Sequence, residues 1–412
     1  VGESSCLIGI YDQKYDLANL SIRICEELCG MMLLKKIGKI STGNTPSKKH
    51  REYYNSDDIG FVKPDSISDT VITEINKTSS FISENAKEKA RIAPKGSILI
   101  TCTGSVGKVG IVTEGEYAFN QQINAIMPNK DVNQKYLAYN LLYNKQRLIN
   151  IANAPVVPIV NKTQLENFEI NFDSNIDAQK KIVEQLDGIA LVIDKRKKQL
   201  DVLDELIKAR FVELFGDPYF NPYKWKKLKI ADAVTVEPQN GLYKPQTDYI
   251  IDGTGIPILR IDCFYNGEVA DWGMLKRLRC TEKDIKRYQL NDDDIVINRV
   301  NSIEYLGKCA HITGMKEKTV FESNMMRMHF DKSRFNPIYI TKLLCTQYIH
   351  DQIIKHAKKA VNQASINQHD VMDFDIYLPP LNMQQEYANF VRQIAKSKLQ
   401  VYQYMVANWL RV

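Results

Sequence analysis

NIDAQKKIVEQLDGIALVIDKRKKQLDVLDELIKARFVELF is the sequence of residues 175–215, and this stretch decides the fold. Its apolar residues lie alternately four and three apart once Arg196 and Arg210 are counted in the series; they are Ile182, Leu186, Ile189, Ile193, Leu200, Leu203, Ile207 and Leu214. This spacing is an a/d heptad seam, with charged residues on the other faces. It predicts one coiled-coil helix from Asn175 to Phe215, which at about 1.5 Å per residue is roughly 60 Å long.

Length and composition limit what surrounds this helix. A chain of 412 residues is typical of two to three domains, and 44% hydrophobic with 25% charged residues is ordinary globular composition. The net charge of +6 is compatible with a polyanionic partner. The eight cysteines form no C-x-x-C pair and no histidine lies at finger spacing, so we expect reduced thiols in the cytoplasm and no metal site. The apolar stretch 17–34 contains Arg23, Glu26 and Glu27, which is too much charge for a membrane span.

The chain divides around the long helix. Residues 1–32 are predicted to be an N-terminal extension that is mainly helical, because Leu17, Leu20, Ile24, Leu28 and Met31 repeat at three and four. Residues 33–174 alternate short β-rich runs with glycines, which predicts a mixed α/β domain. The Gly-Asp-Pro at 216–218 ends the long helix. A second mixed domain is expected over 216–378, and a shorter helix over 379–412.

The two halves repeat. SILITCTGS at 97–105 matches DIVINRVNS at 294–302, and Lys63-Pro64-Asp65 falls on Arg260-Ile261-Asp262 at the same offset. Phe119-Asn120 aligns loosely with Ser323-Asn324, and FEI at 168–170 matches FDI at 374–376 before each helix. A repeat of about two hundred residues is a duplicated domain. The predicted fold is therefore α+β: two duplicated mixed domains and a pair of long antiparallel coiled-coil helices, forming a pseudo-twofold dumbbell.

This plan resembles the specificity subunit of type I restriction–modification systems. The motifs that carry the resemblance are GNTPS at 43–47, GSVGK at 104–108, DAQKKIV at 177–183 and KARFVELFGDP at 208–218, with PPLNMQQ at 379–385 as a partial counterpart in the second half. The resemblance implies two target-recognition domains that each read one half of a split sequence in double-stranded DNA. It also implies that the helices set the gap and bind two methyltransferase subunits, that restriction/translocase subunits join this core, and that the specificity subunit has no catalytic role and no cofactor.

Enzymatic alternatives fit the sequence less well. A DNA methyltransferase that uses S-adenosylmethionine needs an Asn/Asp-Pro-Pro-aromatic loop, and Phe220-Asn221-Pro222-Tyr223 lacks one proline. The 104–108 segment fails the phosphate-loop spacing, because Cys102 and Val109 stand where glycine and Ser/Thr are required. No nuclease motif follows Pro64-Asp65, and we interpret the acidic run 292–294 as a solvated turn. A coiled-coil scaffold that binds proteins remains a third possibility.

DNA recognition requires base-edge readers and phosphate anchors, which are arginine, asparagine, glutamine, lysine and small hydroxyl side chains in loops. In the first domain the candidates are Asn44, Thr45, Lys48, Lys49, Lys63, Ser105, Lys108, Asn120, Gln121, Asn161 and Lys162. In the second they are Lys244, Arg260, Arg299, Asn301, Ser302, Lys308, Asn324, Asn362, Gln363 and Ser365. Taken singly, each of these residues fits an ordinary solvated loop position better than a DNA contact, because loops are polar in general. The repeat favours the DNA-binding interpretation, since Lys63/Arg260 and Ser105/Ser302 occupy equivalent positions.

Overall fold

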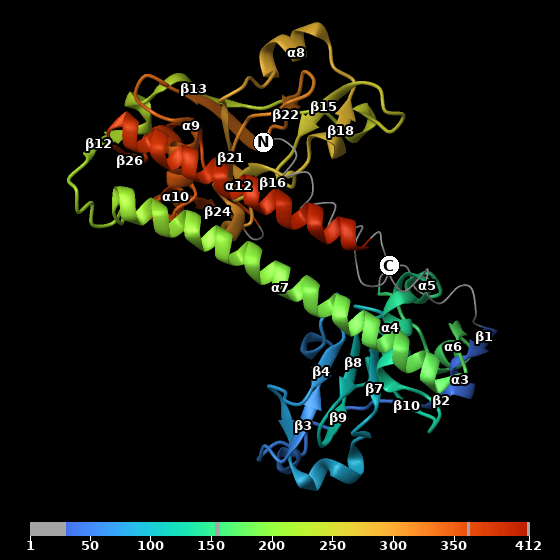
Figure 1. The fold of residues 1–412 in the computed structure, drawn as a ribbon. Coiled ribbons are helices and arrows are strands. Elements are labelled where there is room, and N and C mark those ends of the chain that lie inside the picture. The colour runs from blue at the N-terminus through green and yellow to red at the C-terminus, as the bar shows by residue number, and fades with distance from the viewer. Residues whose placement is uncertain (1–29, 153–156, 361–362, 410–412) are drawn as a thin grey trace. The chain divides into compact units, whose positions relative to one another are not determined.

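The fold is that of a computed structural model, which describes residues 30–152, 157–360 and 363–409 (Figure 1). Contacts divide the chain into two compact units, and the division falls inside the long helix α7, between Lys195 and Arg196. Helix α7 runs from Ile176 to Phe215, which confirms the heptad prediction to within one residue. Gly216 follows it with φ 78°, the left-handed conformation that commonly ends a helix.

The first unit is built on two sheets. One has the order β2-β10-β7-β8-β4 and the other β5-β3-β9-β6, while β1 and β11 form a separate antiparallel pair. The strands are β1 (Gly30–Leu33), β2 (Gly38–Thr42), β3 (Ile59–Val62), β4 (Thr73–Ile75), β5 (Phe81–Ile82), β6 (Ile92–Pro94), β7 (Ile98–Thr101), β8 (Val109–Val112), β9 (Glu116–Phe119), β10 (Ile123–Pro128) and β11 (Glu169–Phe172). The helices are α3 (Leu34–Ile37), α4 (Gln134–Tyr143), α5 (Lys145–Asn150) and α6 (Lys162–Glu166).

The second unit has sheets in the orders β13-β23-β19-β21-β17-β16, β14-β18-β15-β22 and β20-β25-β24, and a β12-β26 pair. The strands are β12 (Lys226–Lys229), β13 (Val234–Asn240), β14 (Tyr249–Ile250), β15 (Ile256–Leu259), β16 (Phe264–Tyr265), β17 (Gly267–Val269), β18 (Lys276–Leu278), β19 (Ile295–Asn298), β20 (Val300–Asn301), β21 (Cys309–His311), β22 (Val320–Phe321), β23 (Met325–Phe330), β24 (Lys358–Lys359), β25 (Ala364–Ser365) and β26 (Asp375–Leu378). The helices are α8 (Glu282–Tyr288), α9 (Pro337–Leu344), α10 (Gln347–His356), α11 (Gln368–Met372) and α12 (Leu381–Trp409).

The duplication is confirmed at the level of strand pairing. Strand β7 lies between β10 and β8, and its counterpart β19 lies between β23 and β21. The outer pairs β4–β8 and β17–β21 are both parallel. β1 pairs with β11, just as β12 pairs with β26 before the second helix. Each half is therefore one mixed α/β domain followed by a long helix, of 40 residues in α7 and 29 in α12.

Within the second unit, the C-terminal part of α7 packs against α12 in antiparallel fashion (Figure 1). Tyr387 of α12 donates a hydrogen bond to the carbonyl of Ile207, Arg210 pairs with Glu386, and Lys398 pairs with Asp204. Phe211, Phe215 and Tyr387 join the buried core of this unit. The seam arginine Arg210 therefore bridges the helices through its charged head.

Three sequence predictions need correction. Gly30, Met31 and Met32 belong to strand β1 and are not helical, because their backbone pairs with β11; the rest of the predicted N-terminal helix lies outside the described residues. The counterpart of Phe119 is Phe321 and not Ser323, as the hydrogen bonds below show. The turn at 292–294 is not simply solvated, because Asp294 is 2% exposed and pairs with Arg327 and His329.

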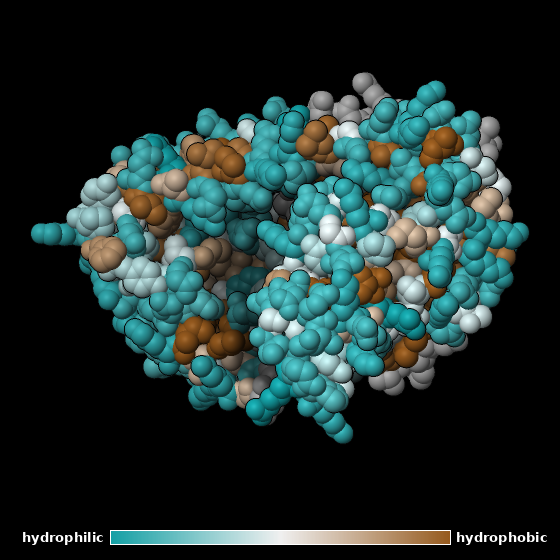
Figure 2. Space-filling model, turned by 90° about the horizontal axis from the view of Figure 1, so that it is seen from below, coloured by the Kyte–Doolittle hydropathy of each residue, from teal (hydrophilic) through white to brown (hydrophobic). Residues whose placement is uncertain are grey.

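Figure 2 shows one face of the molecule, which is mostly hydrophilic with apolar side chains in small scattered groups. Within the part of the chain that the structure describes, no helix is long and apolar enough to cross a membrane.

Candidate nucleic-acid interface

Four loops of the first domain converge at one end of its sheets. They are residues 43–48, 63–66, 102–108 and 119–122, and we call them loop cluster 1. The backbone N–H of Gly43 donates to the Ile123 carbonyl and that of Asn44 to the Phe119 carbonyl, both at 3.0 Å. The backbone N–H of Asn120 donates to the Val62 carbonyl at 3.2 Å, and that of Cys102 donates to the Gln122 carbonyl at 2.7 Å. The loops are thus held on a hydrogen-bonded backbone frame.

The second domain repeats this frame, bond for bond, in loop cluster 2, which comprises residues 241–244, 260–263, 299–308 and 321–324. Gly241 donates to the Met325 carbonyl at 3.1 Å and Leu242 to the Phe321 carbonyl at 2.7 Å. The backbone N–H of Glu322 donates to the Leu259 carbonyl at 3.0 Å, and that of Arg299 donates to the Asn324 carbonyl at 2.8 Å. These bonds place Arg260 at the position of Lys63, as the sequence repeat predicts, and Glu322 at that of Asn120.

Close backbone contact explains the two glycines that open these clusters. A Cβ on Gly43 would lie 2.2 Å from the Asn120 carbonyl oxygen, and one on Gly241 would lie 2.2 Å from that of Glu322. Since these obstacles are backbone atoms, neither position can accept a larger residue without moving the loop behind it.

In loop cluster 1 the predicted side chains fall into exposed and structural groups. Lys48, Lys49 and Ser105 are exposed, and Thr45 donates to the exposed Gln121 at 2.7 Å. Other candidates serve the loops themselves: Asn44 bonds Lys89 and Arg91, Lys63 bonds Ser80, Lys108 bonds the Pro64 carbonyl, and the buried Asn120 bonds Gln122. Asn161 and Lys162 directly follow residues 158–160, whose backbone is hydrogen-bonded to the 102–104 segment. Asn161 caps α6 and Lys162 pairs with Glu166.

Loop cluster 2 gathers a different set of side chains. Arg260 lies near Asp262 and Glu322, Arg299 donates to the Ser323 carbonyl, and Asn301 accepts from the backbone of Ser302. Asn324 contributes its carbonyl to the frame. Lys244 forms an ion pair with Asp284 at 3.0 Å, so its charge is balanced within the domain. Gln363 and Ser365 belong to the β24–β25 hairpin, which joins the cluster through β20, and Asn362 lies outside the described residues.

The charges of the two clusters differ at equivalent positions. Asn120 is neutral, whereas Glu322 is a carboxyl group whose pKa is raised by burial. Lys108 is bonded to a carbonyl, whereas the ammonium of Lys308 lies 4.0 Å from the ring centroid of Tyr265 and 4.9 Å from that of Phe264. Burial lowers the pKa of Lys308. One frame therefore holds side chains of different charge at equivalent positions, and Asn120 and Glu322 are themselves buried.

Sequence reasoning missed two exposed aromatic residues of loop cluster 2. Tyr243 is 78% exposed and follows the Gly241 turn, and Tyr305 is 49% exposed in the 299–308 loop. Tyrosines in such loops offer a flat face and a hydroxyl to a partner. Each lies two positions from a loop glycine, Gly241 or Gly307, and this spacing is the signal available in the sequence.

The potential methyltransferase loop is a structural turn. Asn221 has φ 42°, and its side chain both accepts from the backbone N–H of Trp225 and donates to its carbonyl, each at 2.9 Å. Its amide is thus occupied and not available to hold the amino group of a base.

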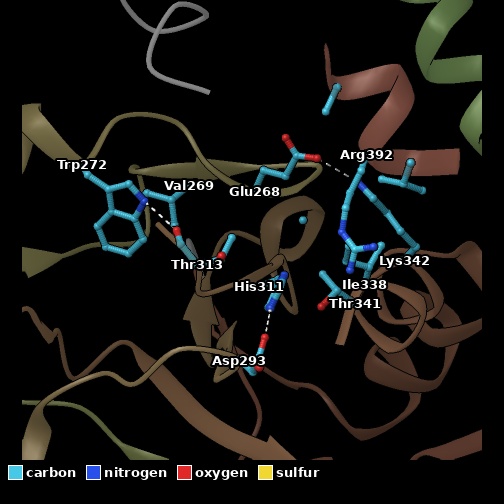
Figure 3. Close-up of a pocket in the computed structure, with 13 residues that line it drawn as sticks. Glu268, Val269, Trp272, Asp293, His311, Thr313, Ile338, Thr341, Lys342 and Arg392 are labelled. Atoms are coloured by element: carbon cyan, nitrogen blue, oxygen red, sulfur yellow. Dashed lines mark hydrogen bonds and ion pairs between the residues drawn. The ribbon is translucent and has the colours of Figure 1, made fainter. Parts of the chain in front are cut away.

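A cavity of about 200 Å³ lies in the second unit between β17, β21, α9 and α12 (Figure 3). His311 contacts Asp293 at 2.9 Å, and Glu268 lies 3.6 Å from Lys342. Trp272 donates from its indole to the Thr313 carbonyl at 3.0 Å. These contacts pair both carboxylates with groups of this chain. Among the described residues, no cluster of histidine, cysteine and carboxylate side chains suits a metal ion.

The chain is similar to known proteins along almost its whole length. The family model for the type I restriction modification DNA specificity domain matches twice, over residues 28–204 and 222–401. The MjaIX type I restriction enzyme specificity subunit of Methanocaldococcus jannaschii is 24% identical over 88% of this chain and 85% of its own. The EcoKI specificity subunit of Escherichia coli is 24% identical over 76% and 71%, respectively. The crystal structure of the type I restriction-modification S subunit from M. genitalium has the same fold, with a TM-score of 0.52 at 13% identity over 93% of this chain and 94% of that one.

Proposed function

The chain belongs to the type I restriction modification DNA specificity family, and from this premise we propose that it reads a bipartite target in double-stranded DNA for a restriction–modification complex. Each recognition domain reads one half of the target through its loop cluster. The observation that carries the proposal is the repeated frame, which holds Asn120 and Lys63 in one domain where it holds Glu322 and Arg260 in the other.

The helices supply the binding surface for the catalytic partners in this proposal. Val202, Leu206 and Val212 are apolar residues of α7 that are 59%, 44% and 50% exposed, and Val202 and Leu206 lie four residues apart on one face. Exposed apolar side chains that share a helix face are typical of a surface that a partner covers. We assign it to the methyltransferase subunits, of which two are expected because the domain–helix unit occurs twice. Restriction/translocase subunits then join this core.

The chain itself acts as a recognition subunit without catalysis, so bond making on DNA belongs to its partners. Its place of action is the cytoplasm, where the DNA is. The exposed side chains of the loop clusters, among them Gln121 and Tyr243, provide sequence discrimination through base edges, while lysines such as Lys48 anchor phosphates.

The test is to co-express the chain with its methyltransferase subunit in a host that lacks DNA methylation and to map the methylated sites across the genome. The expected result is one motif with two specified parts and a fixed number of unspecified bases between them. Tyr243→Ala, in loop cluster 2, should change or relax only one part of the motif. A single uninterrupted motif, or methylation without a motif, would contradict the proposal.

A further inference from the structure

Two cysteines from different elements meet beside loop cluster 2. Cys309 is the first residue of β21 and directly follows Lys308, the last residue of the cluster. Cys345 caps the C-terminus of α9. Their sulfur atoms lie 3.4 Å apart, although the residues are 36 positions apart in the chain. A disulfide requires about 2.05 Å between the sulfurs, so a shift of little more than 1 Å would join them.

The two thiols differ in accessibility. Cys309 is buried, whereas Cys345 is exposed. Cys345 also lines two cavities, one of about 480 Å³ against α7 and one of about 360 Å³ against the 304–308 loop. A small reagent can therefore reach Cys345 first.

Electrostatics favour the same order of reaction. The hydrogen bond from the Cys309 thiol and the nearby Lys342 ammonium lower the pKa of Cys345. The hydrogen bond with Cys345 and burial raise the pKa of Cys309. The thiolate is the reactive form of cysteine, so Cys345 has the character of an attacking thiol and Cys309 that of a resolving thiol.

We propose that Cys345 and Cys309 are a peroxide-reactive dithiol that closes reversibly to a disulfide and thereby ties the end of loop cluster 2 to α9. The Cys345 thiolate attacks one oxygen of hydrogen peroxide, which breaks the O–O bond and gives a sulfenic acid and hydroxide. The Cys309 sulfur then attacks the sulfenic sulfur, so that the S–S bond forms and water leaves with the proton of the Cys309 thiol. The two sulfurs are oxidised and the peroxide is reduced.

Other described cysteines provide internal comparisons. Burial raises the pKa of Cys102 to about 11 and that of Cys263 to about 12. Both therefore carry little thiolate near neutral pH, and we expect Cys345 to react with peroxide at least about tenfold faster than either.

The test treats the full chain, alone and bound to its methyltransferase subunit, with hydrogen peroxide, blocks free thiols with iodoacetamide and identifies linked peptides by mass spectrometry. The expected product is a Cys309–Cys345 linkage that dithiothreitol reverses. Sulfinic or sulfonic acid at Cys345 without the linkage, a linkage of Cys345 to another cysteine, or no reaction at Cys345 would each overturn the proposal. This readout does not depend on DNA binding, so it stands apart from the test of the recognition function.

Variants distinguish the two roles. In Cys309→Ser the sulfenic acid at Cys345 should persist, so that dimedone traps it and overoxidation increases, whereas Cys345→Ser should leave Cys309 reduced. Cys309→Ala serves as a second variant if serine disturbs the buried site, and circular dichroism checks the fold of each. The assignment of Cys345 as the attacking thiol is overturned if Cys309 reacts with peroxide and dimedone in the Cys345→Ser variant to the same extent as the wild-type protein reacts with peroxide.

Discussion

The side-chain oxygen of Gln384 accepts a hydrogen bond of 2.7 Å from the backbone N–H of Asn336, the residue that caps α9. The side-chain nitrogen of Gln384 donates to the carbonyls of Pro379 and Arg334, and the residue is fully buried. Gln179 makes the same bond to Asn133 at 2.7 Å in the first half. In both domains, a buried glutamine near the start of the long helix, α7 or α12, thus holds the N-cap residue of an earlier helix, α4 or α9.

Replacing Gln384 by leucine should therefore destabilise the second unit. The change leaves the Asn336 N–H and two carbonyls buried without partners, and each such group costs about 1–3 kcal/mol. We expect a loss of about 2–4 kcal/mol, given partial relaxation, measured as faster amide hydrogen exchange across α9. Gln393→Leu, at an exposed position of α12, is the matched control and should change exchange little. Equal effects from both variants would refute the role of the buried glutamine.

The sequence predicts the long helix from its periodic apolar residues and the duplication from matched segments such as 97–105 and 294–302. Heptad spacing from Ile182 onward predicts the body of α7, whose start lies within one residue of the predicted Asn175. It cannot reveal that Gln179 and Gln384 are fully buried, because their partners come from segments about 50 residues away. Polar residues within an amphipathic pattern are normally assigned to solvent, and only tertiary structure shows the exception.

The sequence places most of the predicted DNA-contacting residues in the two loop clusters, but it does not separate exposed side chains from those that hold the loops together. Asn161 looks like a base reader, yet it forms a capping box with Gln164, as Asn367 does with Asp370 in the second half. A capping motif and a polar recognition loop have the same composition, so composition could not separate them. The alignment of Phe119 with Ser323 failed because residues are inserted between the matched strands, and only the hydrogen bonds restore the register.

Loop lysines should anchor phosphates without contributing to sequence discrimination. Lys48 is exposed in loop cluster 1, so Lys48→Ala should weaken DNA binding by the methyltransferase complex for all sequences and lower the salt slope by about 0.9. Fluorescence anisotropy across a series of salt concentrations measures both effects. Lys130→Ala is the control, since Lys130 is also exposed but follows the opposite end of β10. An unchanged slope in Lys48→Ala would exclude a phosphate contact at this position.

Acid should weaken the second domain partly through Asp284. The backbone N–H of Thr281 and the Lys244 ammonium lower the pKa of this carboxyl group. Its charged form thus stabilises the folded state, fully above the unfolded pKa of about 3.9, and this contribution disappears as the pH falls through the lower folded pKa.

Asp284→Asn should accordingly reduce the free energy of unfolding by about 0.5–1 kcal/mol at pH 7, with the difference from wild type shrinking towards zero in strong acid. Urea unfolding between pH 2 and about 7, followed by tryptophan fluorescence, measures this. Glu282→Gln removes a neighbouring negative charge in the same helical turn and is the control. A difference that stays constant with pH would show that the charge of Asp284 contributes nothing.

The length of α7 should set the number of unspecified bases in the target. Residues 190–196 of α7 include no buried side chain and precede the contacts at Asp204, Ile207 and Arg210 that join α7 to α12. Deleting these seven residues shortens the helix by about 10 Å while nearly preserving its heptad phase. A length of 10 Å corresponds to about 3 base pairs along DNA. The spacer should therefore shorten by about two to three bases, while both specified halves stay the same.

Genome-wide mapping of methylated sites measures the spacer length and the two specified halves together. Replacing 190–196 by a different helical heptad of equal length should leave the spacer unchanged, and an unchanged spacer in the deletion variant would show that α7 does not act as the ruler.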